Sequence, residues 1–83
     1  LKEGPMVEFV EYIAKAIVQY PDEVRVEEKE IPKGKQLLLY VNQEDMGRVI
    51  GRGGKIANAM RTVLKAVSMK ENCDIYLEIV ANE

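Results

Sequence analysis

The sequence contains no histidine and no tryptophan, and it has only one cysteine, Cys73, and one phenylalanine. Without histidine or a group of cysteines, it lacks the usual ligands of a zinc site and the usual partners of a nucleophile–base pair. A lone cysteine cannot form an intramolecular disulfide, which agrees with a reducing compartment. No apolar run approaches the ~20 residues that span a membrane. We therefore expect no enzyme, no metal and no cofactor, and a cytoplasmic protein without membrane insertion.

The 83 residues are enough for one domain, and the hydrophobic and charged fractions of 47% and 31% are those of a globular protein. The chain begins with Leu1 instead of methionine. We interpret residues 1–5 as a flexible N-terminal segment, a candidate expression remnant with Met6 as the native start. The domain is predicted to cover residues 6–83.

The charge is unevenly distributed. The net charge is −2, which taken alone argues against a ligand such as a nucleic acid. Residues 46–70, however, hold six arginines and lysines and no acid, whereas residues 1–30 and 71–83 are acidic. A nearby ligand responds to the local field, since distant charges are screened by salt. The positive stretch is therefore a candidate binding region.

The hydrophobic pattern predicts six elements. Residues 6–20 carry apolar residues at helical spacing, and Pro21 ends that helix. Residues 24–30 are a short charged strand, expected at a sheet edge, and residues 36–41 (QLLLYV) are a more buried strand beyond a turn at 31–35. Asn42 is expected to cap a short helix.

The second half begins with that short helix, which glycines interrupt. A longer helix restarts near Gly54, and a turn at 72–74 leads to a last strand at 75–80. The order is thus helix, strand, strand, helix, helix, strand. The buried side of the longer helix is predicted to contain Ile56, Met60, Val63, Leu64 and Val67.

Glycines and basic residues gather in GRVIGRGGKI at 47–56. A P-loop would need a glycine at 49 and a hydroxyl at 56, and a dinucleotide fingerprint would need a glycine at 56, so neither signature fits. What fits is G-x-x-G at 51–54 between two helices. Glycine permits the torsions of so tight a turn and lets a phosphodiester backbone approach closely. The unpaired N–H groups that open the second helix would face the same phosphates.

In its context, VIGRGGKI resembles the KH family of single-stranded nucleic-acid-binding domains, whose hallmark is V-I-G-x-x-G-x-x-I/L. Val49, Ile50, Gly51 and Gly54 match it, whereas Ala57 is smaller than usual at the last apolar position. The helix and strand that precede the core match the type II topology. The resemblance implies an α+β fold, in which three helices pack on one side of a three-stranded sheet.

The opening helix VEFVEYIAKAIV, the following PDEV and the segment EDMGRVIGRGGKIANAMRTVL look closest to the KhpA family. These are small bacterial proteins with a single KH domain, thought to act as RNA chaperones or post-transcriptional regulators. Membership implies that they bind single-stranded RNA, alone, as homodimers or with a larger KH protein of the KhpB type.

The resemblance also implies the site, a groove for about four nucleotides with the loop as a clamp on the backbone. An apolar floor and a basic or polar border are expected beside the loop, and a short variable loop is expected elsewhere in the domain. The implied residues are Gly51, Arg52, Gly53 and Gly54 in the loop, Met46, Val49 and Ile50 with Leu39 or a neighbouring strand residue in the floor, Lys55, Asn58 and Arg61 at the border, and Lys33 and Lys35 in the variable loop. Arg48 is also expected to contact RNA.

Plainer interpretations stay open beside these. Met46, Val49 and Ile50 fit the core as well as a groove, and Lys33 and Lys35 fit a turn that they only keep soluble. Arg61 and Lys65 fit an ordinary solvated helix face as well as an RNA contact, and most of the four tyrosines are expected to be packing residues. The alternative for the whole chain is a protein-interaction module on a KH fold that dimerises or holds a partner and binds little RNA. The acidic balance favours that alternative, whereas the intact G-x-x-G with its flanking bases argues against it.

Overall fold

Six helices and strands follow one another in the predicted order. The structure is a computed structural model that describes residues 4–83. The elements are α1 (Pro5–Ile17), β1 (Arg25–Ile31), β2 (Gly34–Val41), α2 (Met46–Ile50), α3 (Lys55–Glu71) and β3 (Asp74–Ala81). Short 3₁₀ turns at Pro21–Glu23, Gln43–Asp45 and Arg52–Gly54 connect them.

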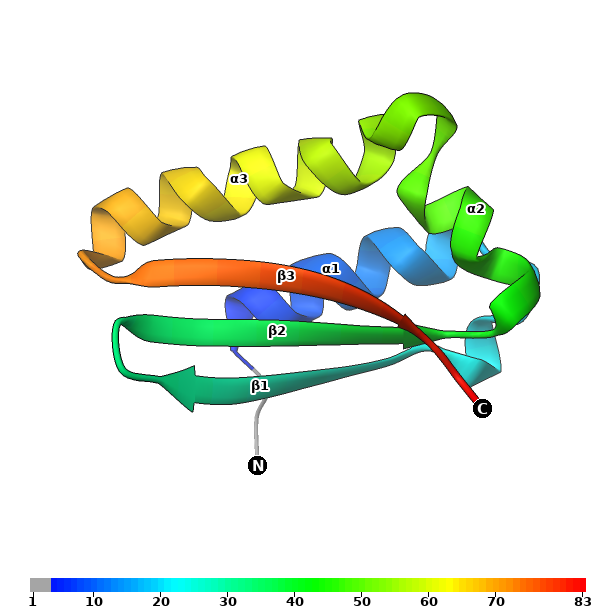
Figure 1. Ribbon diagram of the computed structural model, residues 1–83, viewed down its shortest axis with the longest axis horizontal. Coiled ribbons are helices and arrows are strands. Elements are labelled where there is room, and N and C mark those ends of the chain that lie inside the picture. The colour runs from blue at the N-terminus through cyan, green and yellow to red at the C-terminus, as the bar shows by residue number, and fades with distance from the viewer. Residues whose placement is uncertain (1–3) are drawn as a thin grey trace.

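The three strands form one sheet in the order β1-β2-β3, with β1 antiparallel and β3 parallel to β2. The central strand β2 buries three consecutive leucines, 37 to 39, whereas no residue of the edge strand β1 is fully buried. This confirms the predicted edge and buried strands. All three helices lie on one face of the sheet, and α2 stands at the end where β2 and β3 finish (Figure 1). The α+β architecture is therefore the one expected.

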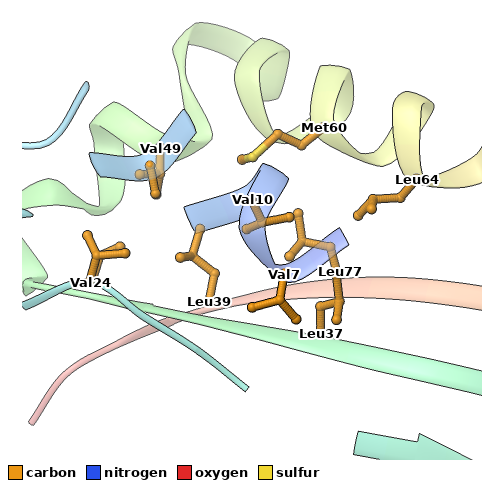
Figure 2. Close-up of a cluster of buried hydrophobic side chains, with 11 residues drawn as sticks. Val7, Val10, Val24, Leu37, Leu39, Val49, Met60, Leu64 and Leu77 are labelled. Carbon is orange, nitrogen blue, oxygen red and sulfur yellow. The ribbon is translucent and has the colours of Figure 1, made fainter. Parts of the chain in front are cut away.

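The core lies between that face of the sheet and the helices. Figure 2 shows Val10 of α1, Val49 of α2 and Met60 of α3 with their side chains directed toward Leu39 and Leu77 of the sheet. Burying an aliphatic side chain of this size stabilises a fold by roughly 1.5–3 kcal/mol. Every helix contributes to one cluster, so the α2–α3 corner is fixed to the sheet by packing.

The first helix differs from the prediction at both ends. It begins at Pro5, one residue before the predicted domain boundary, because proline is well suited to the first turn of a helix. The part of the predicted flexible segment at residues 1–3 lies outside the described residues. The helix ends at Ile17 and not at Tyr20, since the backbone N–H groups of Gln19 and Tyr20 bind the carboxylate of Asp45.

The buried side of α3 was also predicted with one error. Met60 and Leu64 are buried and Ile56 and Val67 are partly buried, as expected, but Val63 is 44% exposed. The side that faces the sheet follows positions 57, 60 and 64 instead, so the small residue Ala57 is buried. Helical spacing alone predicted that Val63 is buried, but it does not show whether another element covers that side of the helix.

Candidate nucleic-acid interface

The loop between α2 and α3 depends on three glycines. Gly51 ends α2, its N–H bonded to the carbonyl of Gly47 at 2.9 Å, and the N–H of Gly54 bonds to the carbonyl of Gly51 at 3.0 Å. Gly51, Gly53 and Gly54 have φ angles of 80°, 64° and 79°. Residues with a side chain seldom adopt such positive φ angles, and glycine adopts them readily. The backbone of this turn therefore accounts for the glycine cluster.

The surroundings of these glycines are not alike. A Cβ atom on Gly51 would lie 2.9 Å from the backbone nitrogen of Ile56, and one on Gly54 would lie 3.4 Å from the amide nitrogen of Asn58. A Cβ on Gly53 would have no heavy atom of the described residues within 4 Å. Gly51 is thus required by the packing of the loop, whereas the backbone at Gly53 faces open space.

Positive charge surrounds this open backbone. Arg52 and Lys55 are exposed, and within residues 4–83 neither has a carboxylate within 4 Å. No side chain caps the start of α3, whose first N–H groups carry the partial positive charge of the helix dipole. Arg48 differs, because its Nε lies 3.5 Å from the carboxylate of Asp45. The arrangement can hold an anion against the loop.

The apolar residues of α2 divide into two groups. Met46 and Ile50 are partly exposed beside the loop and can touch a ligand. Val49 and Leu39 have no exposed surface and lie in the core cluster. The prediction of a shared apolar floor needs this correction: Val49 and Leu39 support the surface from beneath and do not form it.

The border residues on α3 also differ from one another. Asn58 is exposed one turn after Gly54, next to the loop. Arg61 donates from Nε and Nη2 to the carbonyl oxygen of Leu77, at 3.3 and 3.1 Å. This side chain connects α3 to the edge of β3, so it is neither a plain solvated residue nor a freely mobile charge.

The structure separates Lys33 and Lys35 from the loop. They belong to the β1–β2 hairpin, at the opposite end of the sheet from the α2–α3 corner (Figure 1). The helix between the two ends has 17 residues, or about 25 Å at 1.5 Å per residue. The Nζ of Lys35 lies 3.2 Å from a carboxylate oxygen of Glu28, and this hydrogen bond raises the pKa of Lys35. Neither lysine borders a groove at the loop.

One residue of the corner was missed. Asp45 is 0% exposed, and its carboxylate accepts hydrogen bonds from the N–H groups of Gln19 at 2.8 Å and Tyr20 at 3.0 Å. It thereby ties the segment after α1 to the start of α2. In the sequence, Asp45 is one of two acids after a helix-capping Asn42, and nothing in that pattern indicates donors 25 residues away.

A comparison with known protein families shows which family contains the α2–α3 corner described above. Residues 7–79 match the model of the KH domain of KhpA and KhpB. The chain belongs to the KhpA/KhpB family of KH domains. The order of elements, with a helix and a strand before the core, is that of a type II KH fold. The family and fold predictions are confirmed.

Several bacterial relatives of this KH domain are named RNA-binding protein KhpA. The one from Clostridium perfringens is 48% identical over 75 residues, which are 90% of this chain and the whole relative. The one from Borreliella burgdorferi is 43% identical over 77 residues, which are 93% of this chain and 94% of the relative. Both matches include the loop and the elements on either side of it.

A solved structure supports the fold alone. The protein Era from Aquifex aeolicus, bound to GDP.AlF4−, aligns with 92% of this KH domain at a TM-score of 0.57 and 16% identity, and the match covers 29% of Era. Within residues 4–83, no helix is long and apolar enough to cross a membrane. In the same part of the chain, no three cysteine or acidic side chains are placed to hold a metal ion.

Proposed function

We propose that this chain binds single-stranded RNA at the α2–α3 corner, with the loop at residues 51–54 holding the phosphate backbone. The observation that carries the proposal is the open backbone at Gly53, flanked by the unpaired charges of Arg52 and Lys55. A phosphate can approach such a backbone closely. Its oxygens can accept hydrogen bonds from N–H groups of the loop and of the uncapped start of α3. Relatives named RNA-binding proteins support RNA as the ligand.

In this proposal, the loop binds the phosphate backbone of the RNA and the neighbouring surface contacts the bases. Arg52 and Lys55 bind phosphates, while Met46 and Ile50 offer apolar surface to the bases. Among the other expected residues, Arg48, Asn58 and Arg61 border this surface and Val49 supports it from below. Phosphate contacts carry no sequence information, so the preference for particular bases should be weak.

The test introduces negative charge at the two loop positions that are proposed to contact the phosphate. Arg52→Asp combined with Gly53→Asp should weaken binding to a uridine octanucleotide about 10- to 100-fold, since a hydrogen bond to a charged group contributes about 1.5–3 kcal/mol. Aspartate tolerates the left-handed conformation at 53, and its Cβ meets no neighbour, so the fold should persist. Fluorescence anisotropy measures the affinity, and thermal unfolding by circular dichroism checks the fold.

The chain offers a matched control at the far end of α3. Asn72 is exposed and also left-handed, with a φ angle of 59°, and Lys33 is exposed beside it. Lys33→Asp with Asn72→Asp makes the same change in charge and keeps the loop. We expect this control to bind RNA nearly as the parent does. If both double variants lose affinity equally, only overall charge matters and the clamp is wrong.

A single loop of this kind should bind RNA weakly. We therefore propose that the chain acts as part of a dimer. Linking two weak sites raises the effective concentration and the overall affinity. A homodimer, or a heterodimer with a KhpB-type partner, would provide the second site. Such an assembly suits an RNA chaperone or post-transcriptional regulator in the bacterial cytoplasm, and the bacterial relatives support that setting.

The second candidate function is protein association without RNA. A groove of about 490 Å³ between α1 and α3 supports it, because Met6, Phe9, Val63 and Val67 give it apolar walls. Sedimentation equilibrium at rising protein concentration, with and without RNA, tests this candidate. If the chain stays monomeric at every concentration and binds RNA, protein association is excluded and RNA binding remains as the proposed function.

A further inference from the structure

The ion pair of Asp45 and Arg48 joins the interior of the domain to the loop end of α2. Arg48 lies on α2 three residues before Gly51, and its side chain is 57% exposed. Its Nε lies 3.5 Å from Oδ1 of Asp45, whose side chain is 0% exposed. Within residues 4–83, this is the one ion pair in which a partner is fully buried. An exposed arginine is thus anchored on a buried carboxylate.

The carboxylate of Asp45 is itself held in place by the backbone. Oδ1 accepts a hydrogen bond from the N–H of Gln19 at 2.8 Å, and Oδ2 accepts one from the N–H of Tyr20 at 3.0 Å. Rotation of the carboxylate would leave these two donors without an acceptor, which is costly in the interior. An arginine loses side-chain entropy when a ligand immobilises it. A fixed carboxylate restricts Arg48 before a ligand arrives.

The anchor leaves most of the hydrogen-bond donors of Arg48 available. A guanidinium has five N–H donors in one rigid plane, one on Nε and four on the two Nη atoms. Within residues 4–83, neither Nη atom of Arg48 donates a hydrogen bond. Two adjacent Nη groups match two oxygens of a phosphate, a geometry that lysine cannot copy.

We propose that Asp45 is a positioning residue for RNA binding, which orients Arg48 so that its Nη groups meet a phosphate next to those held by the loop. Arg48 touches the phosphate, whereas Asp45 acts only through Arg48. The inference rests on the proposed function and deepens it, because it makes the affinity for a polyanion depend on a negatively charged residue.

The test is a double-mutant cycle that is read by RNA affinity. Fluorescence anisotropy measures binding of a uridine octanucleotide to the parent, Asp45→Asn, Arg48→Gln and the double variant. Arg48→Gln should weaken binding about 10-fold, since a hydrogen bond to a charged group is lost. Asp45→Asn removes a negative charge, yet it should weaken binding about threefold or more. In the Arg48→Gln background, Asp45→Asn should change the affinity by less than about twofold.

Two exposed residues provide matched controls for charge. Glu44 precedes Asp45 and, within residues 4–83, has no basic group within 4 Å. Glu44→Gln should therefore leave RNA binding unchanged or make it slightly stronger, because a charge that repels phosphates is removed. Lys70 lies in the last turn of α3, far from the loop. Lys70→Gln matches Arg48→Gln in charge and should weaken binding by less than about twofold, since salt screens distant charges.

The salt dependence distinguishes positioning from a general loosening of the fold. Each phosphate contact on a single strand contributes about 0.7 to the slope of log affinity against log salt. Arg48→Gln and Asp45→Asn should each reduce that slope by about 0.7, because both lose the same contact. A slope that Asp45→Asn leaves unchanged would show that its loss of affinity arises elsewhere, and the positioning role would be wrong.

Arg48→Lys separates orientation from charge without altering the buried carboxylate. It keeps the positive charge but lacks Nε and the paired Nη groups, so it should weaken binding about threefold or more. Circular dichroism checks the fold of each variant, and Arg48→Lys decides the question if Asp45→Asn does not fold. Unchanged affinity in Arg48→Lys, unchanged or stronger binding by Asp45→Asn, or an equal loss from Asp45→Asn in both backgrounds would overturn the positioning role. A parent that binds no RNA would instead overturn the proposed function.

Discussion

Similar turns lie near the two ends of α3, in different surroundings. The hairpin end has PKGK at 32–35 and the loop end has RGGK at 52–55, each with glycine between basic residues. A Cβ on Gly34 would overlap the carbonyl oxygen of Asp74, whereas one on Gly53 would meet no heavy atom of residues 4–83 within 4 Å. Lys35 is paired with Glu28, whereas Arg52 and Lys55 are unpaired in residues 4–83.

This difference separates glycine that serves packing from glycine that leaves a backbone accessible. At the hairpin, the backbone of another strand occupies the space and Glu28 pairs with Lys35. At the loop, both the space and the charge are available to a ligand. Both turns combine glycine with basic residues, so the neighbours in space distinguish a structural turn from a candidate binding turn.

The largest expected effect follows from that steric contrast. Gly34→Ala should destabilise the fold by about 3 kcal/mol, because its Cβ collides with the backbone of β3 and forces the parallel pair apart. Gly53→Ala should cost only about 1–2 kcal/mol, from its left-handed φ angle alone. Urea unfolding followed by circular dichroism measures both. Equal costs at the two positions would break the comparison.

A smaller but clear effect is expected at Asp45, which holds the loop end in place. Asp45→Ala leaves the N–H groups of Gln19 and Tyr20 without their acceptor and should destabilise the fold by about 2 kcal/mol. The exposed Asp22 is the control, and Asp22→Ala should change stability by no more than about 0.5 kcal/mol.

Hydrogen exchange gives a second readout for this prediction. In Asp45→Ala, the amides of Gln19 and Tyr20 should exchange faster relative to those of β2, because the local tie is lost. Unchanged exchange at both amides would contradict the role assigned to Asp45.

Much of the fold could be predicted, because local rules agree with one another. The run QLLLYV predicted the central strand, and the glycines at 51–54 predicted the turn between helices. The position of Lys33 and Lys35 was open to the same reasoning: β2 leads from the hairpin to α2, so its eight residues, about 26 Å, separate the two ends. The family resemblance assigned these lysines to a short variable loop, and the topology puts that stretch in the β1–β2 hairpin, away from residues 51–54.

The remaining features depend on neighbours that no local pattern reveals. Asp45 finds its donors 25 and 26 residues away, and Gly34 needs to be glycine because Asp74 passes beside it. Val63 has the periodicity of a core residue, yet no described element covers it fully. In each case the sequence identifies the residue type, and only the packed structure shows what that residue contacts.

The most direct measurement of the central claim follows backbone amide shifts by NMR while a uridine octanucleotide is added to the parent chain. Binding by the loop should shift the amides of residues 46–61, above all Arg52 to Lys55. The hairpin at residues 31–36 should stay unshifted and serves as the internal reference. Shifts centred on that hairpin, or no shifts anywhere, would contradict the account.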